Sequence, residues 1–334
     1  MRKYVLEISA GQKNTAGSKA KKDITKILQN NGFTNLNLRL PKSKLLKLFF
    51  AKHIIRKMIR NFKEDDIFVI QYPMYSTLGT DILLKESKKR KVKTICIIHD
   101  IESLRLYKNN ESKIRREQAF LNRFDCLIVH NDEMKKWLFE QGISKPMISL
   151  EIFDYLTKQQ LPEVSMDLNV IFAGNLEKST FLKKWNLDKK ITVFGINPSK
   201  LYPHSVLYEG VKNPDELPEF LSGSFGLVWD GDSIETNNGI FGEYTRYNNP
   251  HKVSLYLSCG LPVIVWKEAA ISSFIEKNEL GITVSSLDEL SSVFDRLTGD
   301  EYLKIRENTT RISSKIRQGY FIKKAVKLAI NTIS

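Results

Sequence analysis

The stretch "NNPHKVSLYLSCGLPVIVW", residues 248–266, predicts one helix followed by one buried strand. Pro250 suits the first turn of a helix and Gly260 suits its C-terminal cap, because proline lacks an N–H and glycine tolerates positive φ. The apolar run after Gly260 predicts a core strand. The helix opens with a single lysine, Lys252, and a helix N-terminus is a natural phosphate site. A purely structural helix start and a phosphate-binding one both fit these residues.

The same alternation of helix and strand runs through the whole chain. Its apolar runs are continuous, as expected when both faces of a parallel sheet are covered. The strands predicted in the first half are "KYVLEIS", "LNLRL", "IFVIQY", "VKTICIIH" and "DCLIVH". Those in the second half are "NVIFAGN", "ITVFGIN", "SVLYEG", "FGLVWD", "LPVIVW" and "GITVSS". The looser segment 151–168 between the two runs, which contains Pro162, predicts a linker.

Two consecutive runs of this kind predict an α/β protein with two Rossmann-like, doubly wound domains. The length of 334 residues agrees, since it exceeds what one ordinary core holds. We expect an N-terminal domain over residues 1–155 and a C-terminal domain over 165–315. A helix over residues 316–334 is expected to pack back on the N-terminal domain.

The formal net charge of +14 indicates an anionic partner or surface. Residues 42–63 hold eight Lys or Arg and no acid. Within them Ile54, Ile55, Met58, Ile59 and Phe62 fall on one helical face and the basic residues on the other. This predicts a helix that packs inward, with a basic face that is either simply solvated or rests on an anionic membrane. No zinc-finger spacing, RNA-binding signature or basic arm interleaved with aromatics is present, so nucleic acid is not expected as a partner.

The cysteines and the apolar runs bear on location. Cys96, Cys126 and Cys259 are isolated in apolar segments without metal spacing, which is typical of reduced core residues. No run of 18 apolar residues is present, so no segment is expected to span a membrane. The sequence predicts a cytoplasmic protein.

Polar residues follow several predicted strands, at the sheet edge where open α/β folds bind ligands. The glycine-bearing turn "SAGQKNTAGSKAKKD", residues 9–23, includes Gly17 and Ser18. It lacks the spacing G-x-G-x-x-G, so a nicotinamide cofactor is poorly supported. His99 and Asp100 follow one strand, Asn175 follows another, and "DGDSIETNNGIFGEY", residues 230–244, follows a third.

The segment "FGLVWDGDSIETNNGIFGEYTRYNNPHKVSLYLSCGLPVIVW", residues 225–266, resembles bacterial β-1,6-galactofuranosyltransferases of surface-polysaccharide assembly. The likeness extends to "AGSKAKKD", "CIIHDIESLR", "VHNDEMKKWL", "EIFDYL", "VIFAGNL" and "VFGIN", and so covers nearly the whole chain. More distantly the chain resembles the glucosyltransferases that extend N-acetylglucosamine on serine-rich adhesins. Both groups are two-Rossmann (GT-B) glycosyltransferases.

The resemblance implies a UDP-sugar donor held mainly by the C-terminal domain and an acceptor bound mainly by the N-terminal domain, with reaction in the cleft between them. It also implies a metal-independent mechanism without a cofactor. Transfer of galactofuranose from its α-linked UDP donor to a β-linked product would invert the anomeric centre.

Within this frame Lys252 and the N-terminus of its helix become the expected pyrophosphate clamp, because the leaving diphosphate needs a charge partner. Gly174 and Asn175 would approach the same phosphates, and Lys178 would add a second cation. The resemblance places the nucleotide base at Gly195 and Ile196, with Phe194 expected in the core. The remaining expected substrate contacts are Gly17 and Ser18 of the glycine-bearing turn, Asn249, His251 as a phosphate donor, and Ser254. Ser254 or a residue of the 230–247 loop would bind the ribose.

One departure concerns the ribose. Many retaining enzymes of this fold carry a glutamate in the helix that the lysine opens, and Leu255 stands there instead. This argues against the common retaining branch and leaves the ribose partner open.

An inverting transfer needs a base for the acceptor hydroxyl. Asp100 is the first candidate, with His99 as the alternative and Asp23 as a third. A helix-capping role for Asp100 stays open. Asp230 and Asp232 have the spacing of a metal-binding D-x-D motif, but we interpret them as a turn that shapes the donor site, with no metal expected.

The function expected from the sequence is transfer of galactofuranose from UDP-galactofuranose to O6 of a sugar on a lipid-linked glycan, by an enzyme peripheral to the inner face of the membrane. The alternatives are a UDP-glucose-dependent glucosyltransferase of adhesins and a catalytically silent partner that binds a nucleotide sugar. A homo-oligomer is compatible with the sequence, which does not fix the oligomeric state.

Overall fold

A computed structural model describes residues 1–7, 16–74, 76–108, 110–161 and 166–334. The chain divides into two compact units. Unit 1 consists of Met1–Leu150 and Phe321–Ser334, and unit 2 consists of Glu151–Tyr320. Most of the predicted glycine-bearing turn (residues 9–15) and part of the predicted linker (162–165) lie outside the described residues.

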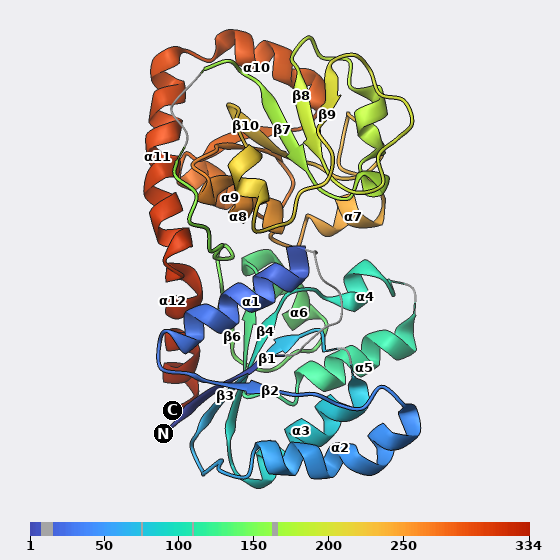
Figure 1. The fold of residues 1–334 in the computed structure, drawn as a ribbon, viewed down its shortest axis with the longest axis vertical. Coiled ribbons are helices and arrows are strands. Elements are labelled where there is room, and N and C mark those ends of the chain that lie inside the picture. The colour runs from blue at the N-terminus through green and yellow to red at the C-terminus, as the bar shows by residue number, and fades with distance from the viewer. Residues whose placement is uncertain (8–15, 75, 109, 162–165) are drawn as a thin grey trace. The chain divides into compact units, whose positions relative to one another are not determined.

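Unit 1 is built on a parallel sheet of six strands in the order β2-β1-β3-β4-β5-β6 (Figure 1). Its strands β3 and β5 are fully buried, and β4 is buried except at Lys93, because helices cover both faces of the sheet. The strands are β1 (Lys3–Glu7), β2 (Thr34–Asn37), β3 (Ile67–Tyr72), β4 (Lys93–Ile98), β5 (Cys126–Val129) and β6 (Met147–Ser149).

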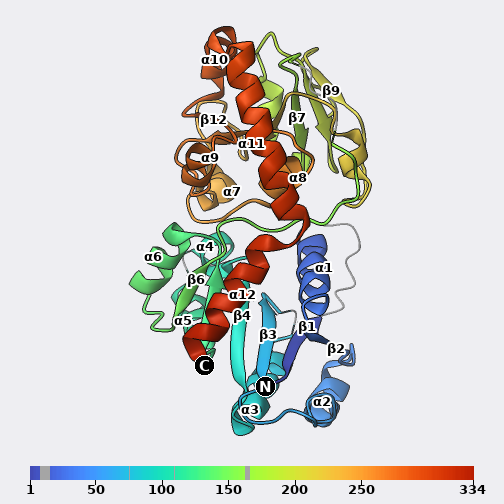
Figure 2. The same cartoon turned by 90° about the vertical axis from the view of Figure 1, so that its left-hand side faces the viewer.

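The helices of unit 1 connect successive strands, and the last one returns from the C-terminus. Figure 2 shows this last helix, α12, between α1 and α6. Its apolar stripe, which includes Phe321, Ile322 and Val326, is buried. The helices are α1 (Ala16–Gln29), α2 (Lys44–Met58), α3 (Thr77–Lys89), α4 (Glu102–Arg105), α5 (Glu111–Leu121), α6 (Asp132–Glu140) and α12 (Tyr320–Ile333).

Unit 2 carries a second parallel sheet of six strands, in the order β12-β11-β10-β7-β8-β9. Counted from its own first strand this is the 3-2-1-4-5-6 order of a dinucleotide-binding fold, with its switch point between β7 and β10. The strands are β7 (Val170–Ala173), β8 (Ile191–Phe194), β9 (Val206–Tyr208), β10 (Phe225–Val228), β11 (Val263–Trp266) and β12 (Gly281–Val284).

The helices of unit 2 are shorter, apart from α11, which packs on α8. The α-helices are α7 (Gly239–Tyr244), α8 (His251–Ser258), α9 (Ser272–Lys277), α10 (Leu290–Arg296) and α11 (Gly299–Arg317). The 3-10 helices are η1 (Leu176–Lys178), η2 (Thr180–Lys184), η3 (Leu217–Phe220) and η4 (Leu287–Glu289).

The two doubly wound sheets confirm the predicted fold class. The predicted strands have counterparts at or within a few residues of their expected places, and β6 is the strand that the sequence pattern did not indicate. The chain passes from unit 2 to unit 1 after Tyr320, a few residues beyond the predicted limit at 316. The reason is that α11 remains tied to unit 2 up to Arg317, whose Nε donates to the Ser258 carbonyl at 2.6 Å.

The predicted amphipathic helix of the basic segment is α2 and the turn after it. Ile55, Ile59 and Phe62 are buried, whereas Lys52 and Lys57 are exposed. Among the described residues, no helix combines the length and the hydropathy needed to cross a membrane.

Candidate functional site

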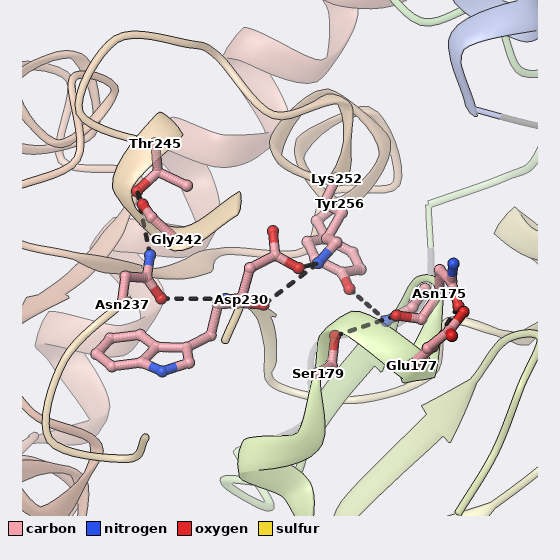
Figure 3. A network of polar contacts seen from close by, with 11 residues as sticks. Asn175, Glu177, Ser179, Asp230, Asn237, Gly242, Thr245, Lys252 and Tyr256 are labelled. Atoms are coloured by element: carbon pink, nitrogen blue, oxygen red, sulfur yellow. Dashed lines mark hydrogen bonds and ion pairs between the residues drawn. The ribbon is translucent and has the colours of Figure 1, made fainter. Parts of the chain in front are cut away.

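Lys252 lies at the switch point of the sheet in unit 2. Its Nζ is 3.1 Å from Oδ1 of Asp230 and 3.3 Å from the carbonyl oxygen of Trp229, both directly after β10 (Figure 3). The same ammonium lies 4.3 Å from the centre of the Phe172 ring in β7. Lys252 therefore places a positive charge where the order of the strands reverses, which is where open α/β sheets bind their ligands.

Tyr256 fixes the helix that carries this lysine. It lies one turn after Lys252, on the same face of α8, and is fully buried. Its hydroxyl oxygen accepts a 2.7 Å hydrogen bond from the Ala173 N–H at the end of β7. A Cβ on Gly226 of β10 would lie 2.3 Å from the Tyr256 ring, so only glycine allows the ring to approach that strand. Tyr256 thus anchors α8 to the two strands that flank the switch point.

The N-terminus of α8 adds backbone donors to the lysine. Pro250 precedes the helix and gives no side-chain cap. Because the first N–H groups of a helix have no partner within it, they are available to an anion, and the helix dipole favours one there. The N-terminus and Lys252 together form a site suited to phosphate groups.

Gly174, Asn175 and Gly195 lie together at the ends of β7 and β8. A Cβ on Gly195 would come within 1.8 Å of the Gly174 carbonyl oxygen, and Gly195 has φ +154°. A Cβ on Gly174 would lie 3.1 Å from Cε of Lys252. Asn175 Oδ1 accepts hydrogen bonds from the Glu177 N–H at 3.2 Å and from Nδ2 of Asn197 at 3.0 Å. The structure therefore brings Gly174 against Lys252, with Asn175 and Gly195 directly beside Gly174.

The other two predicted residues of this edge differ in exposure. The Ile196 side chain is 49% exposed, while its carbonyl accepts from the Leu176 N–H. Nζ of Lys178 lies 3.6 Å from the centre of the Phe241 ring in α7. Phe194 is buried, with Phe220 as a ring neighbour, as the sequence predicted for a core residue.

The loop after β10 is held by its own polar residues. Buried Asn237 accepts from the Asp230 N–H at 3.0 Å, and its Nδ2 donates to Thr245 at 3.2 Å (Figure 3). Nδ2 of Asn238 donates to Asp232 at 2.6 Å. The two aspartates of the D-x-D spacing thus pair with Lys252 and Asn238. Among the described residues, no group of three or more His, Cys, Asp or Glu is placed to hold a metal ion.

The remaining predicted donor residues are engaged in packing. Nδ2 of buried Asn249 donates to the Glu151 carbonyl at 2.8 Å. The His251 ring lies against Phe153 with 4.3 Å between ring centres, and burial lowers the pKa of His251 to about 4. Ser254 is 1% exposed. Their predicted contacts with substrate stay predictions, and His251 would meet a phosphate as a neutral ring.

In unit 1 the two base candidates after β4 differ in accessibility. His99 is buried, and its Nε2 lies 2.8 Å from Oε1 of Gln71. The Asp100 side chain is 28% exposed and pairs with Nη1 of Arg105 at 3.0 Å. Asp100 is therefore the more accessible of the two to a substrate hydroxyl.

Helix α1 brings further charges to this edge. Nζ of Lys21 donates to the Pro73 carbonyl at 2.6 Å, and burial lowers the Lys21 pKa to about 8 against the attraction of Asp100. Asp23, the third base candidate, is buried in an ion pair with Lys19 at 3.0 Å. Gly17 and Ser18 lie in the first turn of α1.

A pocket of about 390 Å³ opens in unit 1 beside the end of β3. Its lining includes Tyr72 and Glu117, and buried Glu117 accepts hydrogen bonds from the Tyr72 hydroxyl at 2.6 Å and from the Ser103 N–H at 2.8 Å. Burial, followed by the charge of Glu117, raises the pKa of Glu102. The lining also includes Tyr107, Phe120, Lys113, Arg116 and Arg123. The pocket thus combines aromatic rings with both signs of charge.

Two family models match the chain nearly end to end. The N-terminal domain of the glucosyltransferase 3-like family matches residues 2–152, and the C-terminal domain of the same family matches residues 170–329. The chain belongs to the glucosyltransferase 3-like family. It is a glycosyltransferase.

Curated relatives match over almost their full length. The chain is 32% identical to the β-1,6-galactofuranosyltransferase WbbI of Escherichia coli (strain K12), with 99% of each chain covered. It is 26% identical to glucosyltransferase 3 of Streptococcus gordonii, with 92% of each chain covered. The galactofuranosyltransferase likeness expected from the sequence is thus confirmed at the level of the whole chain.

Solved structures confirm the GT-B fold. Trehalose-6-phosphate synthase from E. coli bound with UDP-2-fluoro glucose superposes with a TM-score of 0.60 at 10% identity, covering 99% of both chains. Sucrose-phosphate synthase from Thermosynechococcus elongatus gives a TM-score of 0.58 at 11% identity, covering 99% of this chain and 95% of the other. At such identities the likeness concerns the fold alone.

Proposed function

We propose that this glycosyltransferase moves galactofuranose from UDP-galactofuranose to a sugar hydroxyl, O6, of a lipid-linked surface glycan, with inversion and without a metal ion. The observation that carries the proposal is Lys252 at the switch point of unit 2, held by Asp230. The 32% identity to a β-1,6-galactofuranosyltransferase over 99% of both chains supports the sugar and the linkage.

The diphosphate of the donor binds to Lys252 and the first turn of α8. Its negative charge competes with the Asp230 carboxylate for the ammonium, so the clamp is occupied by an internal anion until the donor arrives. As the glycosidic bond breaks, charge grows on the leaving UDP and the lysine stabilises it there. A fixed cation supplies the charge that a metal ion supplies in other glycosyltransferases. Gly174 and Gly195 carry no side chain, so the backbone at the ends of β7 and β8 is open to close approach by the nucleotide.

Asp100 acts as the base in this proposal. An inverting transfer requires a group that accepts the proton of the acceptor hydroxyl as the oxygen attacks the anomeric carbon. Asp100 is partly exposed at the carboxyl end of β4, and its ion pair with Arg105 holds the carboxylate form in one orientation. The burial of His99 against Gln71 supports a positioning role for that residue.

The acceptor sugar occupies the pocket of unit 1. Sugar rings bind where an aromatic face lies beside carboxylates and other hydrogen-bonding groups. Phe120 and Tyr107 supply aromatic rings, and Glu102 supplies a carboxyl group with a raised pKa.

The net charge of +14 supports an enzyme that works at the anionic cytoplasmic face of a membrane, where a lipid-linked acceptor is presented. The basic face of α2 and the turn after it supports the same location, since Lys52, Lys57 and Arg60 are exposed.

A glucosyltransferase is the second candidate. It is favoured by the family description and by the glucosyltransferase 3 relatives at 26% and 24% identity. This alternative keeps the same clamp and changes only the sugar that the site selects.

The experiment is a donor screen with purified protein. Release of UDP is measured for UDP-galactofuranose made in situ, UDP-galactose, UDP-glucose and UDP-N-acetylglucosamine, with an octyl glucoside or galactoside as acceptor. We expect turnover with UDP-galactofuranose and a β-1,6 linkage in the product by NMR. Turnover with UDP-glucose alone would move the protein to the second candidate. UDP binding without turnover of any donor or acceptor would instead favour a catalytically silent nucleotide-sugar partner.

A further inference from the structure

Helix α2 presents an exposed apolar patch that the packing of unit 1 does not use. Five of the six residues from 45 to 50 are large and apolar, and each is between 50% and 73% exposed. They are Leu45, Leu46, Leu48, Phe49 and Phe50. Soluble proteins expose single apolar residues routinely, but a contiguous patch of this kind marks a contact surface. We therefore ask what this apolar patch contacts.

The second half of the helix is the part that packs on unit 1. Ala51, Ile55 and Ile59 are fully buried, and they hold the helix on unit 1, where α2 contacts α3. Arg56 pairs with Glu86 of α3 at 3.0 Å. Leu48 lies one turn before Ala51 on this same side and is still 62% exposed, so the exposed apolar residues belong to a first half of the helix that the packing of unit 1 leaves uncovered.

The outward face changes character along the helix. In the first half the apolar residues are exposed on several sides of the helix, whereas the exposed residues of the second half, which include Lys52, His53 and Lys57, and Arg60 in the turn after it, are basic or titratable. Lys42, Lys44 and Lys47 surround the apolar part, and no acid occurs from residue 42 to 63. Such a surface matches a layer with an apolar interior and an anionic rim.

We propose that the apolar half of α2, Leu45–Phe50, inserts into an anionic lipid bilayer while its basic half lies on the headgroups. This deepens the proposed function, because it assigns the membrane location to a named insertion element instead of to net charge. A second copy of the chain fits less well, since a self-complementary contact would place two cationic helices against each other.

Vesicle sedimentation of the full chain separates insertion from charge attraction. Vesicles of 30% phosphatidylglycerol in phosphatidylcholine are compared with pure phosphatidylcholine, at 0.1 and 0.5 M NaCl. Charge attraction between exposed groups is screened at high salt, whereas apolar insertion persists. We expect binding to the anionic vesicles that falls less than tenfold between the two salt concentrations. Complete loss of binding at 0.5 M NaCl would overturn insertion.

The decisive variant is Leu48→Ser/Phe49→Ser, which removes apolar area and leaves every charge. Its matched control is Leu303→Ser/Phe139→Ser, one Leu and one Phe that are 48% and 70% exposed elsewhere. We expect the α2 variant to bind anionic vesicles at least tenfold more weakly, and the control to stay within twofold of wild type. Equal binding by the α2 variant and wild type would refute the proposal. The proposal would also be refuted if the wild-type protein formed a dimer that did not bind vesicles, and if the α2 variant were a monomer.

A fluorescent label tests depth directly. The native cysteines are 0–1% exposed, so a cysteine introduced by Phe49→Cys is the accessible thiol for an environment-sensitive NBD label. We expect a blue shift and brightening of that label on anionic vesicles, and neither for the same label at Phe139→Cys. An unshifted label at position 49 would contradict insertion. These readouts need no enzyme activity, so they stand or fall separately from the donor screen.

Discussion

Lys252 and Asp230 form an ion pair across the switch point of unit 2, with 3.1 Å between Nζ and Oδ1 and both side chains 18% exposed. The pair joins the first turn of α8 to the end of β10. A pair this accessible can exchange one anion for another at modest cost, whereas a fully buried pair could not. The ion pair therefore explains how a diphosphate site can hold a positive charge that already has a partner, Asp230, before the donor binds.

We therefore expect Lys252→Ala to weaken UDP binding and to lower kcat by about 100-fold or more, the loss typical of removing one charged stabiliser of a transition state. Isothermal titration with UDP and the UDP-release assay measure the two effects. Lys304→Ala is the matched control, since Lys304 pairs with Glu279 on the surface of the same unit. Unchanged turnover in Lys252→Ala would show that Lys252 does not stabilise the leaving diphosphate.

Asp230→Asn gives the reciprocal test. It keeps the shape of the side chain but removes the anion that competes with the diphosphate, so we expect UDP to bind more tightly than to wild type, by a few fold. Weaker binding would show instead that Asp230 orients the lysine for the donor. Titration at several salt concentrations separates this from general electrostatics.

Much of the fold could be predicted because parallel strands buried on both faces leave continuous apolar runs in the sequence. "IFVIQY" is such a run, and its six residues are the six of β3. β6 was missed because three residues behind Pro146 are too few to form a pattern. The passage from α11 to α12 was misplaced by a few residues because side-chain bonds such as that of Arg317 to the Ser258 carbonyl decide it, and no sequence period reports such bonds.

The site was predicted less completely than the fold. Lys252, Gly174, Asn175 and Gly195 were expected together, and they are neighbours because the ends of β7, β8 and α8 meet at one edge. The role of Asp230 as the partner of Lys252 was missed, because its spacing suggested only a turn. The anchoring role of Tyr256 was also missed. Two features of the sequence could have indicated this role: Tyr256 follows Lys252 by four residues, and the strand "FGLV" contains a glycine on which a ring can pack.

Tyr256→Phe should destabilise unit 2. It removes the oxygen that accepts the Ala173 N–H and leaves a buried donor unpaired, at a cost of about 1–3 kcal/mol in the free energy of unfolding. Tyr208→Phe is the control, because the Tyr208 hydroxyl bonds the Gly195 carbonyl at an exposed site where water replaces it. Urea unfolding followed by tryptophan fluorescence reports mainly unit 2, which holds buried Trp185, Trp229 and Trp266, whereas Trp137 belongs to unit 1. Equal midpoints for the two variants would contradict the anchoring role.

Asp100→Asn should lower kcat by about 10²- to 10⁴-fold and leave UDP affinity unchanged, because it removes the proton acceptor and not the donor site. The pH profile of the residual activity should lose its acidic limb. Asp65→Asn serves as the control, since Asp65 is an exposed aspartate of unit 1 that pairs only with Lys93 among the described residues. Activity retained within tenfold would exclude Asp100 as the base and turn attention to His99.

The buried ring of His251 should make unit 2 sensitive to mild acid. Burial lowers its pKa in the folded state to about 4, from an ordinary value near 6.5. Between these two values the unfolded chain binds the proton and the folded chain does not. The free energy of unfolding therefore falls as the pH drops from 6.5 towards 4.

His251→Phe keeps a ring against Phe153 and removes this titration. From pH 7 to pH 5 we expect the wild type to lose up to roughly 2 kcal/mol more stability than the variant, at 1.36 kcal/mol per pKa unit. Urea unfolding of both proteins at pH 7, 6 and 5, followed by tryptophan fluorescence, measures the difference. If the two curves stay parallel over this range, the His251 ring is accessible to protons in the folded protein, and it then becomes available as a charged partner for the diphosphate beside Lys252.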